Sequence, residues 1–287
     1  MNFGVAQQPT PAMIASAQRA MEATLDLRPE DHVLVVGDEV CGACPGAFAA
    51  GARMYGCRVT TYELPPSGRP LEQVPDDLRA LIPGPTVVIN AIAGHIAETP
   101  FRIAWLEMIE RLGTIRMAHA PGISEDMMTG GSLDVDYRRM HLRESLMRDL
   151  LDGAESLRLT TPLGTDLTVD VRGRRFISDL KARVDCCINL PCGEIYCAPV
   201  ENSATGAVVI DGPFGDSGVP PLPVRVELAA GRAVDVQCDD LLWRDRLQRL
   251  LQKDPGAAVV GELGIGLNPG ARLVGRMLED EKALRTA

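Results

Sequence analysis

The first 150 residues alternate short apolar segments with helical ones, and this alternation limits the fold more than any other feature of the chain. Apolar runs such as "HVLVVGD" (32–38) and "TVVINAIAG" (86–94) have the length and β-branched content of buried strands. Between such runs lie segments with apolar residues at helical spacing, for example 12–27 and 100–113. Two further strands are predicted, at 57–64 and 114–120. Strands that alternate with helices of this length form β-α-β units, so we predict an α/β N-terminal domain with a parallel sheet.

The pattern changes after about residue 153. A long helix is predicted over 132–157, and beyond it strands follow one another without helices between them. The segment "PVRVELAAGRAVDVQC" (223–238) alternates apolar and polar residues around Ala-Gly-Arg, which is typical of a β-hairpin. Helices are expected at 240–254 and 272–286. We therefore predict an α+β C-terminal domain with antiparallel hairpins, and a division into 1–153 and 154–287.

Charge and hydropathy exclude several classes of function. The net charge is −10, whereas a nucleic-acid-binding surface needs clustered Lys and Arg. No apolar run approaches the roughly 18 residues of a membrane-spanning helix, and the N-terminus lacks the pattern of a signal peptide. We therefore expect a cytoplasmic protein that binds neither nucleic acid nor a membrane. The eight cysteines fit buried thiols in a reducing compartment, with a redox role for the Cys41-x-x-Cys44 pair as the alternative.

Familiar catalytic motifs are missing from the α/β half. The glycines of "VVGDEVCGACPGA" match neither the dinucleotide-binding spacing nor a P-loop. Asp38 and Glu39 nevertheless follow a parallel strand, where open α/β sheets place ligands. His95 and His119 also follow strands, but neither has a second ligand at metal-binding spacing. A structural role in a tight turn or a polar loop explains these residues equally well, and ligand contact is the alternative.

Two carboxylates stand in apolar surroundings in the second half. Glu194 and Glu262 each follow a glycine, and each precedes apolar residues and then a proline. Burying an ionised carboxylate is costly unless a cation or several hydrogen bonds compensate it. Paired carboxylates can bridge divalent cations or divide acid and base work. The alternative is that each glutamate pairs with one of the arginines of the chain, and the spacing alone does not decide between the two.

The two glutamate segments resemble the thermophilic metallo-aminopeptidase family. The matching motifs are "NLPCGEIYCAPVENSATGAVVIDG" and "GELGIGLNPGARLVGRMLEDEKAL", in that order. The resemblance implies a metal-dependent, often dimeric, exopeptidase that uses Zn, Co, Mg or Mn, with Glu194 and Glu262 as metal ligands and catalytic residues. Glu201 and Asn268 become candidates for substrate binding, with a surface salt bridge as the alternative for Glu201.

The resemblance also leaves two other functions open. The family's later metal ligands, which are a histidine, a tyrosine and an H-x-D pair, are expected beyond residue 287, in a longer natural chain. A shortened relative would be a catalytically inactive homologue that acts as a binding or dimeric scaffold protein. Other proteins of similar shape are iron-dependent dioxygenases that cleave the ring of a dihydroxypyridine, and this is the second enzymatic alternative.

Overall fold

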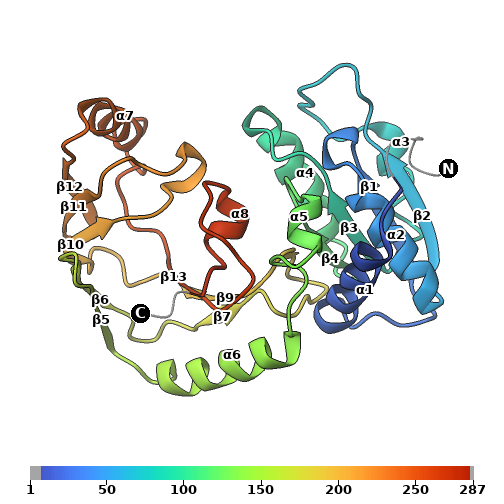
Figure 1. The fold of residues 1–287 in the computed structure, drawn as a ribbon, viewed down its shortest axis with the longest axis horizontal. Helices are drawn as coiled ribbons and strands as arrows, with labels where there is room; N and C mark the ends of the chain where they lie inside the picture. The colour runs from blue at the N-terminus through green and yellow to red at the C-terminus, as the bar shows by residue number, and fades with distance from the viewer. Residues whose placement is uncertain (1–7, 285–287) are drawn as a thin grey trace.

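The computed structural model describes residues 8–284, apart from the side chain of Asp216, and its first half is built on a parallel sheet. The strand order is β2-β1-β3-β4-β8, and every neighbouring pair is parallel (Figure 1). The strands are β1 (His32–Gly37), β2 (Arg58–Glu63), β3 (Val87–Ala91), β4 (Arg116–His119) and β8 (Ile188–Asn189). Four of these five strands were predicted from the alternation of apolar and helical segments.

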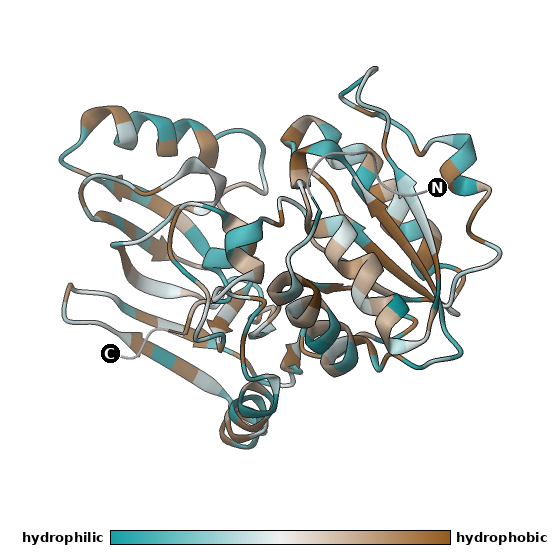
Figure 2. Cartoon of the chain, turned by 45° about the vertical axis from the view of Figure 1, so that its right-hand side comes forward, coloured by the Kyte–Doolittle hydropathy of each residue, from teal (hydrophilic) through white to brown (hydrophobic). Residues whose placement is uncertain are grey.

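Helices cover both faces of this sheet. Helices α1 (Pro11–Leu25) and α2 (Cys44–Tyr55) pack on one face, and α4 (Thr99–Glu110) packs on the other. Successive residues of a strand point to opposite faces, so Val33 and Val35 contact the first core cluster while Leu34 and Val36 contact the second. Burial on both faces explains why the central strands β1 and β3 are almost continuously apolar, as the brown strands in Figure 2 show.

The second half contains two antiparallel sheets. The larger has the order β12-β11-β10-β6-β5 and the smaller has the order β13-β9-β7. Their strands are β5 (Ser156–Thr160), β6 (Asp166–Asp170), β7 (Ile177–Ser178), β9 (Glu194–Cys197), β10 (Thr205–Ile210), β11 (Val224–Ala229), β12 (Arg232–Gln237) and β13 (Leu263–Gly266). Helix α7 (Leu241–Leu251) buries Leu247 against the larger sheet. These sheets and the parallel sheet together confirm the predicted fold class.

Helix α6 (Tyr137–Leu151) connects the two halves and runs along the outside of the molecule (Figure 1). The remaining short helices are α3 (Asp76–Arg79), α5 (Glu125–Met128), α8 (Met277–Asp280) and three 3-10 turns, at Glu39–Cys41, Ile96–Glu98 and Gly215–Ser217. Among residues 8–284, no helix is both long and apolar enough to cross a lipid bilayer.

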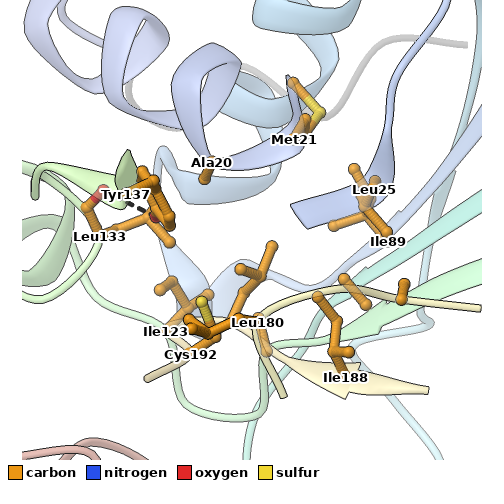
Figure 3. Close-up of a cluster of buried hydrophobic side chains, with 14 of the residues drawn as sticks. Ala20, Met21, Leu25, Ile89, Ile123, Leu133, Tyr137, Leu180, Ile188 and Cys192 are labelled. Atoms are coloured by element: carbon orange, nitrogen blue, oxygen red, sulfur yellow. Dashed lines mark hydrogen bonds between the residues drawn. The ribbon is translucent and has the colours of Figure 1, made fainter. Parts of the chain in front are cut away.

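The first core cluster extends across both halves of the chain. Strand β8 comes from the second half of the sequence, yet it pairs with β4 of the first sheet. Figure 3 shows Leu180 and Cys192 next to Ile123 of the first half, and all three belong to the first core cluster. The predicted boundary near residue 153 therefore marks a change of sheet type, and it does not separate two independent cores.

The predicted helix over 272–286 was wrong for most of its length. Of this segment only α8 is helical. Gly275 has φ +83°, a left-handed conformation that interrupts a right-handed helix. After α8 the backbone runs beside the GELGIGLNP segment, where Asn268 donates to the Lys282 carbonyl and Leu284 donates to the Asn268 carbonyl. Residues 285 and 286 of the predicted helix lie outside the described residues.

Candidate active site

Glu194 is the first residue of β9, and the turn before it fixes where its side chain lies. The backbone N–H groups of Gly193 and Glu194 each donate to Asp179 Oδ1, at 2.9 Å. Gly193 has φ +127°, and a Cβ there would lie 2.7 Å from the Cβ of Asn268. Only glycine meets both requirements at this point. The Pro-Cys-Gly-Glu turn therefore directs the carboxylate of Glu194 into the protein, where its residue is 5% exposed.

The cation that faces Glu194 is a lysine. Lys282 Nζ lies 2.8 Å from Glu194 Oε2, 3.0 Å from Asp179 Oδ2 and 2.8 Å from Glu281 Oε1. Its side chain is 2% exposed. Of the three carboxylates, Glu194 accepts a hydrogen bond from the ammonium group, and the contacts with Asp179 and Glu281 are ion pairs. We call Asp179, Glu194, Glu281 and Lys282 the lysine cluster.

The lysine cluster contains more negative than positive charge. Burial alone would lower the pKa of Lys282, but the carboxylates of Asp179, Glu194 and Glu281 raise it, so the lysine is charged. The pKa of Glu194 is raised to about 7, mainly by burial and also by the charges of Glu281 and Asp179, while Lys282 opposes this rise. One ammonium cannot neutralise three carboxylates, so Glu194 can take up and release a proton near neutral pH.

Glu262 lies on the same face of the small sheet as Glu194. In the antiparallel register Gly266 is opposite Glu194 and Gly264 is opposite Tyr196. Glu262 precedes Gly264 by two residues, so its side chain points to this face as well. A Cβ on Gly264 would lie 2.0 Å from Glu194 Oε1, which means that the carboxylate of Glu194 occupies the space over this glycine.

Glu262 differs from Glu194 in its exposure to solvent. Its residue is exposed, and partial burial of the carboxyl raises its pKa, with a further increase from the negative charge of Glu281. The influence of Glu281 and Lys282 on its pKa places Glu262 at the solvent side of the lysine cluster. The structure thus brings the two predicted glutamates together on one face, with Gly264 between them.

The other two predicted site residues lie elsewhere or have other partners. Glu201 is in an exposed ion pair with Arg174, which was the alternative given for it. Asn268 is fully buried, and its amide nitrogen donates to the carbonyls of Ser132 and Cys192, at 2.8 Å each. Its amide oxygen accepts from Gly270. Because both amide hydrogens are already used, we do not retain Asn268 as a substrate-binding residue.

A cavity of about 480 Å³ adjoins the lysine cluster. It lies at the carboxyl edge of the parallel sheet, where the loops after β3 and β4 and the end of β8 meet the segment 275–281. Arg102, Asn189, Arg276 and Glu281 supply its polar wall. Glu281 belongs to both the cavity and the lysine cluster, and the volume is within the range of small-molecule sites. The segment that contains α8 therefore connects the cavity to Glu194.

The sequence profile of the thermophilic metalloprotease family (M29) matches residues 137–283, which include the whole lysine cluster. The chain belongs to this family. This confirms the resemblance carried by the two glutamate motifs. The family is one of metal-dependent peptidases, so membership makes peptide-bond hydrolysis the class of activity and implies dependence on a divalent metal.

Solved structures agree on the fold. The 2,5-dihydroxypyridine dioxygenase of Pseudomonas putida KT2440 superposes with a TM-score of 0.68 at 17% identity, over 96% of this chain and 85% of that chain. Wild-type AmpT from Thermus thermophilus superposes with a TM-score of 0.63 at 17% identity, over 95% of this chain and 83% of that chain. No curated protein matches the sequence. At this identity the two structures establish a shared fold, and they do not assign a reaction.

The described residues do not fit a divalent metal by themselves. No group of three or more His, Cys, Asp or Glu side chains within residues 8–284 is placed to hold a metal ion. The carboxylates of Asp179, Glu194 and Glu281 do converge on one point, but the ammonium of Lys282 occupies it. The predicted metal roles of Glu194 and Glu262 thus stay predictions that this arrangement does not favour.

The candidates of the α/β half are structural. Asp38 is buried and accepts hydrogen bonds from the backbone N–H groups of Cys41 and Ala93. Burial, followed by the charge of Arg102, lowers the pKa of His119 to about 3, so this histidine is neutral. His95 is exposed. All eight cysteines are free thiols, and Cys41 and Cys44 are buried in the first core cluster.

Sequence reasoning missed Asp179, Glu281 and Lys282. Asp179 stands alone in a loop and gives no signal. Glu281 and Lys282 lie in the quoted family motif "EDEKAL", but their charges read as the solvated face of a helix. One signal was available. Lys282 lies in the same family motif as Glu262, and a search of that motif for a cation to pair with a buried glutamate would have found it.

Proposed function

We propose that this protein is an aminopeptidase that removes N-terminal residues from short peptides. The observation that carries the proposal is that Glu281, which lines the cavity, puts negative charge beside both Glu194 and Glu262. A peptide with a free N-terminus carries an ammonium group, which such carboxylates attract. An internal peptide bond is uncharged, so these carboxylates would not attract it.

Each residue of the lysine cluster has a role in this proposal. Glu194 exchanges a proton with the reacting water or the leaving amine, because its pKa of about 7 is near the working pH. Lys282 and Asp179 hold Glu194 and its turn in place. Glu262, which is solvent-exposed, is the residue that we assign to the ammonium group of the substrate.

The test compares leucine p-nitroanilide with its N-acetylated form, each with and without added Zn²⁺, Mn²⁺ or Co²⁺. We expect cleavage of the free amine only, and its loss in the variant Glu194→Gln by at least about 100-fold. Circular dichroism of the variant establishes that the fold persists. Equal cleavage of the acetylated substrate would show an endopeptidase, and cleavage of neither would favour the inactive homologue.

The iron-dependent dioxygenase is the second candidate function, because a dihydroxypyridine dioxygenase shares the fold of this chain with a TM-score of 0.68. Non-haem iron sites of oxygenases use two histidines and one carboxylate. Within residues 8–284 no group of His, Cys, Asp and Glu side chains is arranged to hold a metal, and this observation applies to both candidates, so it does not decide between them. Oxygen uptake with ferrous iron and a dihydroxypyridine, without cleavage of leucine p-nitroanilide, would favour the dioxygenase.

A further inference from the structure

Three polar side chains form a row on one face of the parallel sheet, at its carboxyl edge. In the parallel register Asn90 of β3 is opposite His119 of β4, and His119 is opposite Asn189 of β8. Residues paired in this way point to the same face of a sheet. Helix α4 covers this face, because its Trp105 donates a hydrogen bond to the side-chain oxygen of Asn90. The polar row therefore crosses three adjacent strands beside α4.

The two inner members of the polar row are buried and incompletely paired. Asn90 is fully buried, and His119 is 7% exposed. Within residues 8–284, neither the amide nitrogen of Asn90 nor Nδ1 of His119 has a hydrogen-bond partner. Asn189 is half-buried and lines the cavity beside the lysine cluster, so the row leads from the core to the cavity wall. An unpaired buried polar group costs free energy, so its presence behind this wall points to a polar binding role.

Arg102 supplies a positive charge where the polar row reaches the cavity. It lies on α4 and lines the cavity together with Asn189. Burial lowers the pKa of His119 and the charge of Arg102 lowers it further, which places the two side chains close together. A guanidinium has five N–H donors in a planar fork, which matches the two oxygens of a carboxylate. Arg102 and Asn189 can thus both donate to one anionic group in the cavity.

The negative charge of the cavity lies on a different element. Glu281 directly follows α8, on the segment that faces α4 across the cavity (Figure 1). This residue belongs to the lysine cluster, in which carboxylates outnumber the cation. Arg276 of the same segment forms ion pairs with Asp126 and Glu279, which balance its charge. The cavity therefore presents negative charge on one wall and a guanidinium on the other.

We propose that Arg102 and Asn189 bind the C-terminal carboxylate of the substrate, so that the cavity selects short peptides with both ends free. This inference rests on the proposed aminopeptidase function, in which the carboxylates near Glu194 attract the N-terminal ammonium group. His119 does not touch the substrate and is a positioning residue behind the pair. An extended dipeptide or tripeptide is about 7 to 11 Å long, and the C-terminus of a longer peptide would extend out of a cavity of about 480 Å³.

Calorimetric titration with leucyl-glycine and with its C-terminal amide tests the carboxylate site, since the two ligands differ in the charge of one end. The titrations are made without added metal ion, so that the ligand is not consumed. We expect leucyl-glycine to bind at least about tenfold more tightly than its amide. Equal binding of the two ligands to the wild type overturns the proposal, and so does a lack of measurable binding of either.

Two arginine variants test whether Arg102 is the cause of this preference. Arg102→Met is expected to weaken the binding of leucyl-glycine by at least about tenfold and to remove the difference between the two ligands. The matched control is Arg111→Met, just beyond the end of α4, where the side chain is 77% exposed. The control is expected to keep the preference of the wild type. A preference that Arg102→Met retains in full overturns the assignment.

Kinetics with added divalent metal separates this inference from the proposed function. We expect kcat/KM for leucyl-glycine to exceed that for its amide by at least about tenfold, mainly through KM. Cleavage of both with equal KM would overturn the carboxylate site and leave the aminopeptidase function standing. Cleavage of neither, with leucyl-glycine still bound more tightly than its amide, would overturn the aminopeptidase function and leave the carboxylate site standing.

Discussion

At the scale of single residues, the stability of the fold depends on the opposite charges in the lysine cluster remaining paired. Three carboxylates surround one ammonium at 2.8 to 3.0 Å, and the side chains of Asp179, Glu194 and Lys282 are at most 7% exposed. Removing one partner from a buried ion pair leaves an uncompensated charge and costs several kcal/mol. The excess of negative charge makes Glu194 the group on which pH acts.

The pH dependence of stability follows from the raised pKa of Glu194. An unfolded glutamate titrates near 4.5 and the folded one near 7, so between these values the native state binds the proton that the unfolded state has lost. Its stabilising contribution is complete below pH 4.5 and is lost as pH rises through 7. We expect the free energy of unfolding of the wild type to fall by about 2 kcal/mol more than that of Glu194→Gln between pH 5 and pH 7.

Urea denaturation at a series of pH values measures this difference. Glu201→Gln is the control, because this exposed glutamate has a lowered pKa, caused by backbone hydrogen bonding and by Arg174. Parallel curves for wild type and Glu194→Gln would contradict the assigned pKa.

The sequence indicated Glu194 and Glu262 but not the other three residues around them. A glycine before each glutamate, in an apolar run, was enough to select Glu194 and Glu262, and the strand period then places both on one face. Asp179 and Lys282 reach Glu194 from residues 15 positions before it and 88 positions after it. Contacts at such separations depend on the tertiary fold, which local pattern does not contain.

At the scale of elements, the small sheet shows how glycine creates room for a functional side chain. Strand β13 reads Leu-Gly-Ile-Gly, and its two glycines share the face that carries Glu194 and Glu262. The space that a side chain would fill over Gly264 holds the carboxylate of Glu194 instead. Over Gly266 it holds the carbonyl of Ala283, 2.2 Å from the position of a Cβ.

Gly264→Ala is expected to displace the carboxylate of Glu194 without unfolding the protein. The added methyl group would overlap Glu194 Oε1, and the end of a side chain can move where backbone cannot. We expect a loss of about 1–2 kcal/mol in stability and a fall of at least about tenfold in kcat of the proposed reaction. Gly261→Ala is the matched control, since nothing lies within 4 Å of a Cβ there. Equal kcat values for the two variants would show that the reaction does not depend on the position of the Glu194 carboxylate.

Local pattern predicted most elements and failed where backbone pairing overrides it. Four strands of the parallel sheet and the hairpin over 223–238 form where the local pattern places them. The segment 272–286 also has helical spacing, but Gly275 and the pairing of its last residues with Asn268 draw it into an extended path. The two-residue strand β8 is too short to carry a period at all.

At the scale of the whole molecule, Asn268 links the two halves. Its buried amide joins the Ser132 carbonyl of the first half to the Cys192 carbonyl of the second. Together with the shared core cluster, this predicts that the chain unfolds in one cooperative transition.

Asn268→Ala is expected to lower the free energy of unfolding by about 3 kcal/mol, because two carbonyls lose their donors in a fully buried place. Calorimetry should show a single transition for the wild type and for the variant, at a lower temperature in the variant. Gln237→Ala, at an exposed position, is the control and should change little. Two separated transitions in the wild type would mean that the halves are independent after all.

Strand β8 is synthesised well after its neighbour β4, and this order affects folding during translation. A ribosome releases the N-terminal residues first, so β4 leaves it about 70 residues before its outer neighbour β8 does, a delay of roughly 10 s. During this time the nascent sheet has an unpaired edge, which is the kind of surface that joins wrong partners. The newly made first half is therefore a natural client for chaperones until residues 188–189 close its edge.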